Sequence, residues 1–245
     1  MKIIVAGASH GVPEKNRACT SIFITSGENT YIIDAGADIS SLLVNYGIPH
    51  KTVKSIMITH PHGDHFDGLV PFCDQLHWYY GYDECVPEFL IPDEMISRAI
   101  NSWLEITHPA TGTYRRDGFN FSVYNEGVIF DDGVIKVTAI QNHHIPKNAY
   151  SFFVECEGKK IFFTGDVGYG FEEIPTLLGN KHYDLVFCEG AHHNPGTAND
   201  FLKAIDTDHL VIHHINLERE PALRQIKDEV SFKVDYADDG LTIEY

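Results

Sequence analysis

The stretch His60-Pro61-His62-Gly63-Asp64-His65 follows the apolar run 55–59 and places three imidazoles and one carboxylate within six residues. Such groups are costly to bury without a hydrogen-bond partner or a metal ion. Residues two apart in an extended segment point the same way, so the first two histidines can bind one ion while the final Asp-His pair turns toward a second. The stretch therefore predicts a strand that ends in a two-metal hydrolytic site.

The composition limits the class of partner. The chain has 245 residues, and its 35 acidic and 18 basic side chains give a formal charge of −17. Nucleic acid is therefore disfavoured as a large-surface partner, because phosphate contacts need clustered Lys and Arg. We expect a small-molecule substrate, and the sequence leaves a homodimer open. The five cysteines are scattered without a Cys-x-x-Cys pair, which favours reduced core residues over disulfides or a thiolate zinc site.

The length and the apolar runs predict the organisation of the chain. We expect one domain over residues 1–245, because a chain of this length can bury a large hydrophobic core. The apolar run 2–6 is too short for a signal peptide and is expected to form a strand. No apolar stretch approaches the roughly 20 residues that cross a bilayer, so we expect a cytoplasmic protein without membrane contact.

The pattern of apolar residues and turns predicts strands alternating with helices in both halves of the chain. Asp38 and Gly47 are expected to cap and to stop the first helix. The expected helices span residues 38–46, 66–80 and 92–106. The expected strands span residues 2–6, 20–25, 30–34, 55–59, 86–91, 119–124, 134–140, 150–155, 160–164, 184–188, 209–213, 232–236 and 241–245. This order predicts an α/β (α+β) fold of two mixed sheets packed face to face with helices outside.

Further polar side chains follow apolar strands, and strand ends can converge on one rim of a sheet. The expected ligands are His60, His62 and His143 for one ion, Asp64, His65 and His214 for the other, and Asp166 as a bridge. Nitrogen and carboxylate donors suit two divalent ions such as zinc, with manganese or iron as alternatives, better than calcium.

Two adjacent histidine pairs leave the choice of ligand open. Only one of His143 and His144 is expected to face the ions, and we favour His143. In the second pair we favour His214, with His213 packed in the sheet. Asp34 is expected to orient a ligand rather than to bind metal.

These residues, in this order, resemble the metallo-β-lactamase fold superfamily of metallohydrolases. Asp34 matches the first motif, His60-x-His62-x-Asp64-His65 the second, and His143, Asp166 and His214 the third to fifth. The resemblance covers nearly the whole chain and implies a four-layer αβ/βα sandwich with a dinuclear centre at one edge of the sheets.

The motif His-x-His-Gly-Asp-His, with glycine before Asp64, is most similar to that of the ribonuclease Z and phosphodiesterase branch of the superfamily. The segment His143-His144-Ile145-Pro146 looks like the His-Ser-Ile-Pro of the nuclease branch. The chain departs from ribonuclease Z in two ways. It has Cys188-Glu189-Gly190-Ala191 where that family has His-Glu-Ala-Thr, and it lacks a long basic arm for tRNA.

The sequence thus predicts a dinuclear metal-dependent hydrolase, a phosphodiesterase that acts on a small-molecule or nucleotide phosphodiester through a metal-bridging hydroxide. Asp64 and Asp166 are the expected catalytic carboxylates. His192 is the candidate proton donor to the leaving oxygen, although an exposed loop histidine is a competing interpretation. One alternative is a hydrolase of a lactone, thioester or β-lactam, with Tyr150 or His192 stabilising the oxyanion. A metal-binding protein without turnover is another.

Overall fold

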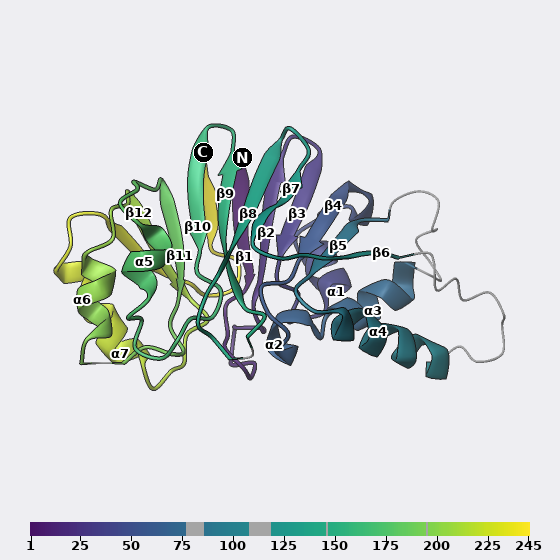
Figure 1. Ribbon diagram of the computed structural model, residues 1–245, viewed down its shortest axis with the longest axis horizontal. Helices are drawn as coiled ribbons and strands as arrows, with labels where there is room; N and C mark the ends of the chain where they lie inside the picture. Colours follow the sequence, from purple (N-terminus) through teal and green to yellow (C-terminus); the bar gives the residue numbers. More distant parts are fainter. Residues whose placement is uncertain (77–85, 108–118, 146, 195) are drawn as a thin grey trace.

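The computed structural model describes all residues except 77–85, 108–118, 146 and 195. Two mixed sheets of seven strands each pack face to face (Figure 1). The first sheet has the order β14 (Thr242–Glu244), β1 (Lys2–Gly7), β2 (Ser21–Ser26), β3 (Asn29–Ile33), β4 (Val53–Met57), β5 (Glu88–Ile91) and β6 (Asn120–Val123). The second has the order β13 (Lys233–Tyr236), β12 (His209–His213), β11 (Leu185–Glu189), β10 (Lys159–Phe163), β9 (Tyr150–Cys156), β8 (Ile135–Gln141) and β7 (Gly127–Asp131).

Both sheets combine an antiparallel side with a parallel side. In the first sheet β3, β4, β5 and β6 are parallel, and in the second β10, β11, β12 and β13 are parallel. Strand β8 also runs in the direction of β10, because both pair antiparallel with β9. The carboxyl ends of β8, β10, β11 and β12 therefore lie at the same edge of the second sheet.

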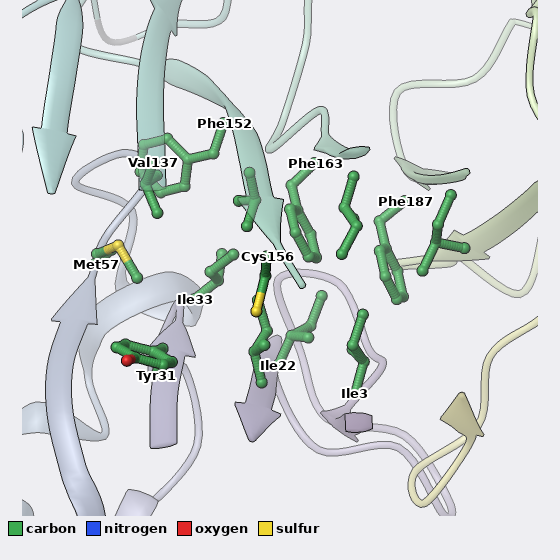
Figure 2. Close-up of a cluster of buried hydrophobic side chains, with 14 of the residues drawn as sticks. Ile3, Ile22, Tyr31, Ile33, Met57, Val137, Phe152, Cys156, Phe163 and Phe187 are labelled. Carbon is green, nitrogen blue, oxygen red and sulfur yellow. The ribbon is translucent and has the colours of Figure 1, made fainter. Parts of the chain in front are cut away.

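The main core lies between the two sheets. Along β1, Ile3 and Val5 face the second sheet, whereas Ile4 packs toward the helices. Figure 2 shows the inner face, where Ile3 and Ile22 of the first sheet lie opposite phenylalanines such as Phe163 of the second. Strands buried on both faces need apolar residues at almost every position, which explains the continuous apolar runs in the sequence.

Helices cover the outer faces of both sheets and complete four layers (Figure 1). The first sheet is covered by α1 (Ile39–Asn45), α3 (Leu69–Gln75) and α4 (Glu94–Thr107). The second is covered by α5 (Ile174–Leu178), α6 (Ala198–Lys203) and α7 (Glu220–Leu223). Three further elements are short: α2 (Gly63–Phe66), η1 (His50–Thr52) and η4 (Arg224–Asp228). The predicted αβ/βα architecture is confirmed.

Most predicted elements are found, but one helix differs and one strand was not predicted. Asp38 caps α1 as expected, because its side chain accepts hydrogen bonds from the backbone N–H groups of Ser40 and Ser41. The helix expected over 66–80 begins only at Leu69, because a separate short helix, α2, ends at Phe66. Between them, Gly68 packs on the loop that joins β3 to α1, and its N–H donates to the carbonyl of Ala35 at 2.8 Å. The expected end of this helix lies outside the described residues. Strand β7, which is only partly buried, was not predicted.

No helix in the described part of the chain is both long and apolar enough to cross a membrane.

Candidate metal site

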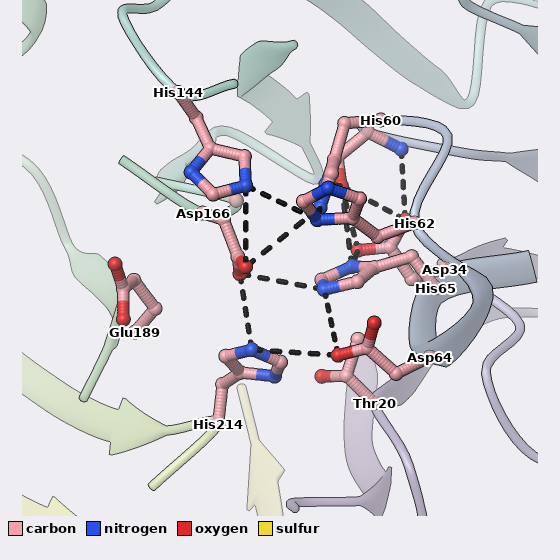
Figure 3. A network of polar contacts seen from close by, with 12 residues as sticks. Thr20, Asp34, His60, His62, Asp64, His65, His144, Asp166, Glu189 and His214 are labelled. Carbon is pink, nitrogen blue, oxygen red and sulfur yellow. Dashed lines mark hydrogen bonds and ion pairs between the residues drawn. The ribbon is translucent and has the colours of Figure 1, made fainter. Parts of the chain in front are cut away.

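Histidine and carboxylate side chains from both sheets meet at the edge where the parallel strands end (Figure 3). The loop after β4 carries the 60–65 stretch, and the loops after β8, β10 and β12 supply His144, Asp166 and His214. Their donor atoms form two adjacent groups. The first contains His60, His62, His144 and Asp166, and the second contains Asp64, His65 and His214.

In the first group, three imidazole nitrogens converge on a small volume. The Nε2 atoms of His60 and His144 lie 3.0 and 3.2 Å from Nδ1 of His62. Both also lie within 3.8 Å of Asp166 Oδ2. Burial lowers the pKa of His60 well below its ordinary value and also lowers the pKa of His144. Neutral rings keep a nitrogen lone pair, so this group can coordinate a cation.

The second group faces the other oxygen of Asp166. Asp166 Oδ1 lies 3.3 Å from His65 Nε2 and 3.2 Å from His214 Nε2, and Asp64 Oδ2 lies within 3.7 Å of both rings. Despite burial, His214 and His65 hold the pKa of Asp166 well below its ordinary value. Within the described residues, His65 Nε2 and Asp166 Oδ1 are buried without a hydrogen-bond partner, and a cation between them would satisfy both.

Asp34 fixes the orientation of His65 from outside both groups. Its Oδ2 lies 2.9 Å from Nδ1 of His65, and its Oδ1 accepts the backbone N–H of Thr59 at 2.7 Å. A proton on Nδ1 leaves Nε2 free for a metal, which is the role expected for Asp34. Burial lowers the pKa of His65, but Asp166 and Asp34 outweigh this effect and raise the pKa well above its ordinary value. Metal binding at His65 would therefore release a proton.

The preference for His143 over His144 was wrong. The side chain of His143 is 86% exposed, and its Nδ1 lies 3.4 Å from Oε2 of Glu173. Successive residues of an extended segment point to opposite sides, and buried Asn142 and exposed His143 are followed by buried His144. The alternation after β8 thus turns His144, and not its neighbour, toward the first group.

The other histidine pair lies as expected. His214 belongs to the second group and has a backbone φ of 52°, so the chain turns sharply where β12 ends. His213 is buried within β12 and faces Thr20, whose hydroxyl lies 3.4 Å from its Nδ1. Burial lowers the pKa of His213 to about 3.

His192 lies beside the first group and is held by Glu189. Its Nδ1 is 2.8 Å from Oε1 of Glu189, and its backbone N–H donates to Oε2 at 2.9 Å. The ring centroid is 4.8 Å from that of His144. Although burial acts in the opposite direction, Glu189 raises the pKa of His192 to about 9. Sequence reasoning treated Glu189 only as a departure from a motif, although an acid that ends the apolar strand β11 was a usable signal.

A cavity of about 690 Å³ adjoins the first group and gives a ligand room beside it. His144 forms part of its wall, together with Gln141, His143 and Lys147. The donors of both groups are imidazole nitrogens and carboxylate oxygens, which suit divalent transition metals. The arrangement can therefore hold cations next to a bound substrate.

Comparisons with known proteins agree with this fold. Ribonuclease Z of Geobacillus kaustophilus (strain HTA426) is 30% identical over 158 residues, which cover 63% of this chain and 48% of that protein. The chain spans about half the length of the curated relatives it matches.

Several solved structures match along the whole chain, among them the following two. The metallo-beta-lactamase fold protein YhfI from Bacillus subtilis has a TM-score of 0.76 at 20% identity, and human tRNase Z, short form, has 0.74 at 21% identity. Each match covers 100% of this chain and 99% of the other. The family model described as Anti-Pycsar protein Apyc1 matches residues 1–200. The protein thus has the metallo-β-lactamase fold, and the chain belongs to the Anti-Pycsar protein Apyc1 family.

Proposed function

We propose that the protein is a dinuclear metal-dependent hydrolase that cleaves a phosphodiester bond in a small molecule or a nucleotide. The observation that carries this proposal is the position of Asp166, whose Oδ2 faces the first group and whose Oδ1 faces the second. A carboxylate so placed can bridge two ions. The relative named ribonuclease Z supports phosphodiester chemistry, and the charge of −17 favours a small substrate over a long nucleic acid.

The donor set fits two divalent ions, zinc or else manganese or iron. His60, His62, His144 and Asp166 would hold one ion, and Asp64, His65, His214 and Asp166 the other. When bound, such ions supply Lewis acidity to phosphoryl oxygens and acidify water. The residues of the chain then have two tasks, which are to fix the ligand rings and to deliver a proton.

His192 is the proposed proton donor. Glu189 holds its Nδ1, so the opposite ring nitrogen is free to meet a substrate beside His144. As water attacks phosphorus, it would lose one proton to solvent. The P–O bond to the leaving group breaks, and His192 would transfer its proton to the leaving oxygen. The resulting neutral ring remains hydrogen-bonded to Glu189. The side chain is 31% exposed, so solvent can restore the proton.

The first experiment measures turnover of bis-p-nitrophenyl phosphate and a panel of small nucleotide phosphodiesters by metal-loaded protein. We expect His62→Ala and Asp64→Ala to abolish turnover. His182→Ala, an exposed histidine paired with Asp206, should retain wild-type rates and serves as the matched control. Absence of turnover with two bound ions would overturn the proposal. So would a preference for lactones, thioesters or β-lactams assayed in parallel.

A second experiment tests His192 through the leaving group. General acid catalysis typically contributes about 10²- to 10⁴-fold, and p-nitrophenolate needs little protonation. His192→Gln should therefore slow cleavage of an alkyl phosphodiester far more than cleavage of the p-nitrophenyl ester. Glu189→Gln should show the same selectivity in weaker form. Equal loss on both substrates would contradict a proton-donor role.

A further inference from the structure

Glu173 joins two loops that carry residues of the first group. It directly precedes α5 and is 9% exposed. Its Oε2 accepts the backbone N–H of His143 at 2.8 Å, and its Oε1 accepts that of Gly168 at 2.6 Å. One loop follows β8 and the other follows β10. We propose that Glu173 is a positioning residue that sets the separation of His144 and Asp166, an inference that rests on the proposed metal-dependent function.

The two bonds lie next to the residues that they would position. His143 immediately precedes His144, and Gly168 comes two residues after Asp166. The absence of a side chain at Gly168 eases the approach, because a Cβ there would lie 3.2 Å from Oε1 of Glu173, slightly closer than an ordinary contact. A single buried carboxylate therefore fixes both loops at once.

Asn142 makes the complementary connection between the same loops. Its Oδ1 accepts the backbone N–H of His144 at 3.2 Å, and its Nδ2 donates to the carbonyl of Asp166 at 2.8 Å. The two loops are thus tied through both their N–H and their C=O groups. Neither Asn142 nor Glu173 belongs to the candidate ligand groups.

The side-chain contacts of Glu173 do not serve its own helix, although its backbone carbonyl accepts the N–H groups of Thr176 and Leu177. The carboxylate accepts no capping hydrogen bond from α5, which is described in full, so both oxygens are directed to the two loops. Only a carboxylate offers two equivalent acceptors in this position. In Glu173→Gln the amide keeps one acceptor and presents N–H groups to the other backbone donor, which would release one loop.

The test is a titration of the metal-free protein with Co²⁺, followed by visible absorption. Substitution of outer partners of metal ligands typically weakens metal binding about 10- to 100-fold. We expect Glu173→Gln to weaken one of two Co²⁺ affinities by this factor and the other by clearly less, since His144 belongs to the first group only. The exposed neighbour variant Glu172→Gln should titrate like the wild type and is the matched control.

Two further measurements keep the inference refutable if Glu173→Gln folds poorly. Glu173→Asp keeps both acceptors on a shorter side chain and should give an intermediate Co²⁺ affinity. In the wild type without metal, hydrogen exchange at the amides of His143 and Gly168 should be slow. The inference is overturned if Glu173→Gln binds Co²⁺ with both wild-type affinities. It is also overturned if both affinities fall equally while the melting temperature of the apoprotein drops, or if the amides of His143 and Gly168 exchange rapidly in the wild type. A wild type that binds two ions without turnover overturns only the proposed function.

Discussion

The substitution Asp34→Asn isolates the contribution of a carboxylate that contacts His65 at Nδ1, and not at the Nε2 atom that faces the second group. Asp34 has a backbone φ of 58°, a conformation that asparagine adopts as readily as aspartate, so the exchange adds no backbone strain. The amide can keep the hydrogen bond from the backbone of Thr59. Its NH₂ group would then face Nδ1 of His65, where the carboxylate had accepted.

The expected magnitude follows from that one contact. A hydrogen bond between a ring N–H and a buried carboxylate contributes about 1.5–3 kcal/mol, which corresponds to roughly 10- to 150-fold in an equilibrium constant. Donation from the introduced amide would make Nδ1 of His65 an acceptor and move the ring proton to Nε2, the atom that lies 3.3 Å from Asp166 Oδ1. A protonated Nε2 has no lone pair for a metal, so the affinity of the second group should fall by that factor.

The assay is a metal titration of wild type and Asp34→Asn, combined with ¹⁵N chemical shifts of the His65 ring. Asp228→Asn, an exposed aspartate at the end of η4, is the control for loss of one charge. The reasoning would be refuted if Asp34→Asn bound both ions with wild-type affinity, or if His65 kept its proton on Nδ1.

Further predictions address the remaining parts of the site. His144→Ala should lose at least one metal ion and turnover, whereas His143→Ala should stay within about threefold of wild type, as metal analysis and initial rates will show. Gly36→Ala should unfold the protein or misplace Asp64, since the added Cβ would lie 1.7 Å from the backbone oxygen of Asp64, and metal content with melting temperature reports this. Because the pKa of His213 is lowered to about 3 in the folded protein, its ring stays neutral there, whereas the unfolded chain takes up a proton below about pH 6.5. The stability that is present above pH 6.5 is therefore lost as the pH falls toward 3. In urea unfolding of the metal-free protein, the free energy of unfolding should fall by about 1 kcal/mol more between pH 7 and 5.5 for the wild type than for His213→Gln. Removal of metal by a chelator should lower the melting temperature, because ions that bind only the folded state stabilise it.

The fold could be predicted because its strands are buried in a layered core. Such strands appear as continuous apolar runs, and a polar group placed directly after a run must lie at the edge of a sheet. This reasoning brought Asp166 and His214 to the 60–65 stretch, as the structure shows. It failed at β7, whose apolar run is only three residues long, Val128-Ile129-Phe130, and whose residues are partly or fully exposed.

The choice between His143 and His144 could not be made from the strand pattern alone. A shift of one residue exchanges the two faces of an extended segment, and nothing in the sequence fixes where β8 stops alternating. The structure fixes it through Asn142, whose buried amide bonds to the carbonyl of Asp166, 24 residues further along the chain. The side chain that decides the ligand is therefore itself positioned by a contact between distant segments.

The same cause explains which residues the sequence did not reveal. The candidate ligands come in short local patterns at strand ends, whereas the carboxylates behind them act on partners that folding brings near. Glu173 reaches back 30 residues to His143. Asp34 directly follows an apolar strand and could be assigned from the sequence, although its partner His65 lies 31 residues further along the chain. Glu173 has no such local signature, because its role depends on where the loops lie in space. Since Glu173 fixes the backbone of two loops whose side chains must face a cation, the accuracy of the candidate metal site depends in part on a residue that only the folded chain identifies.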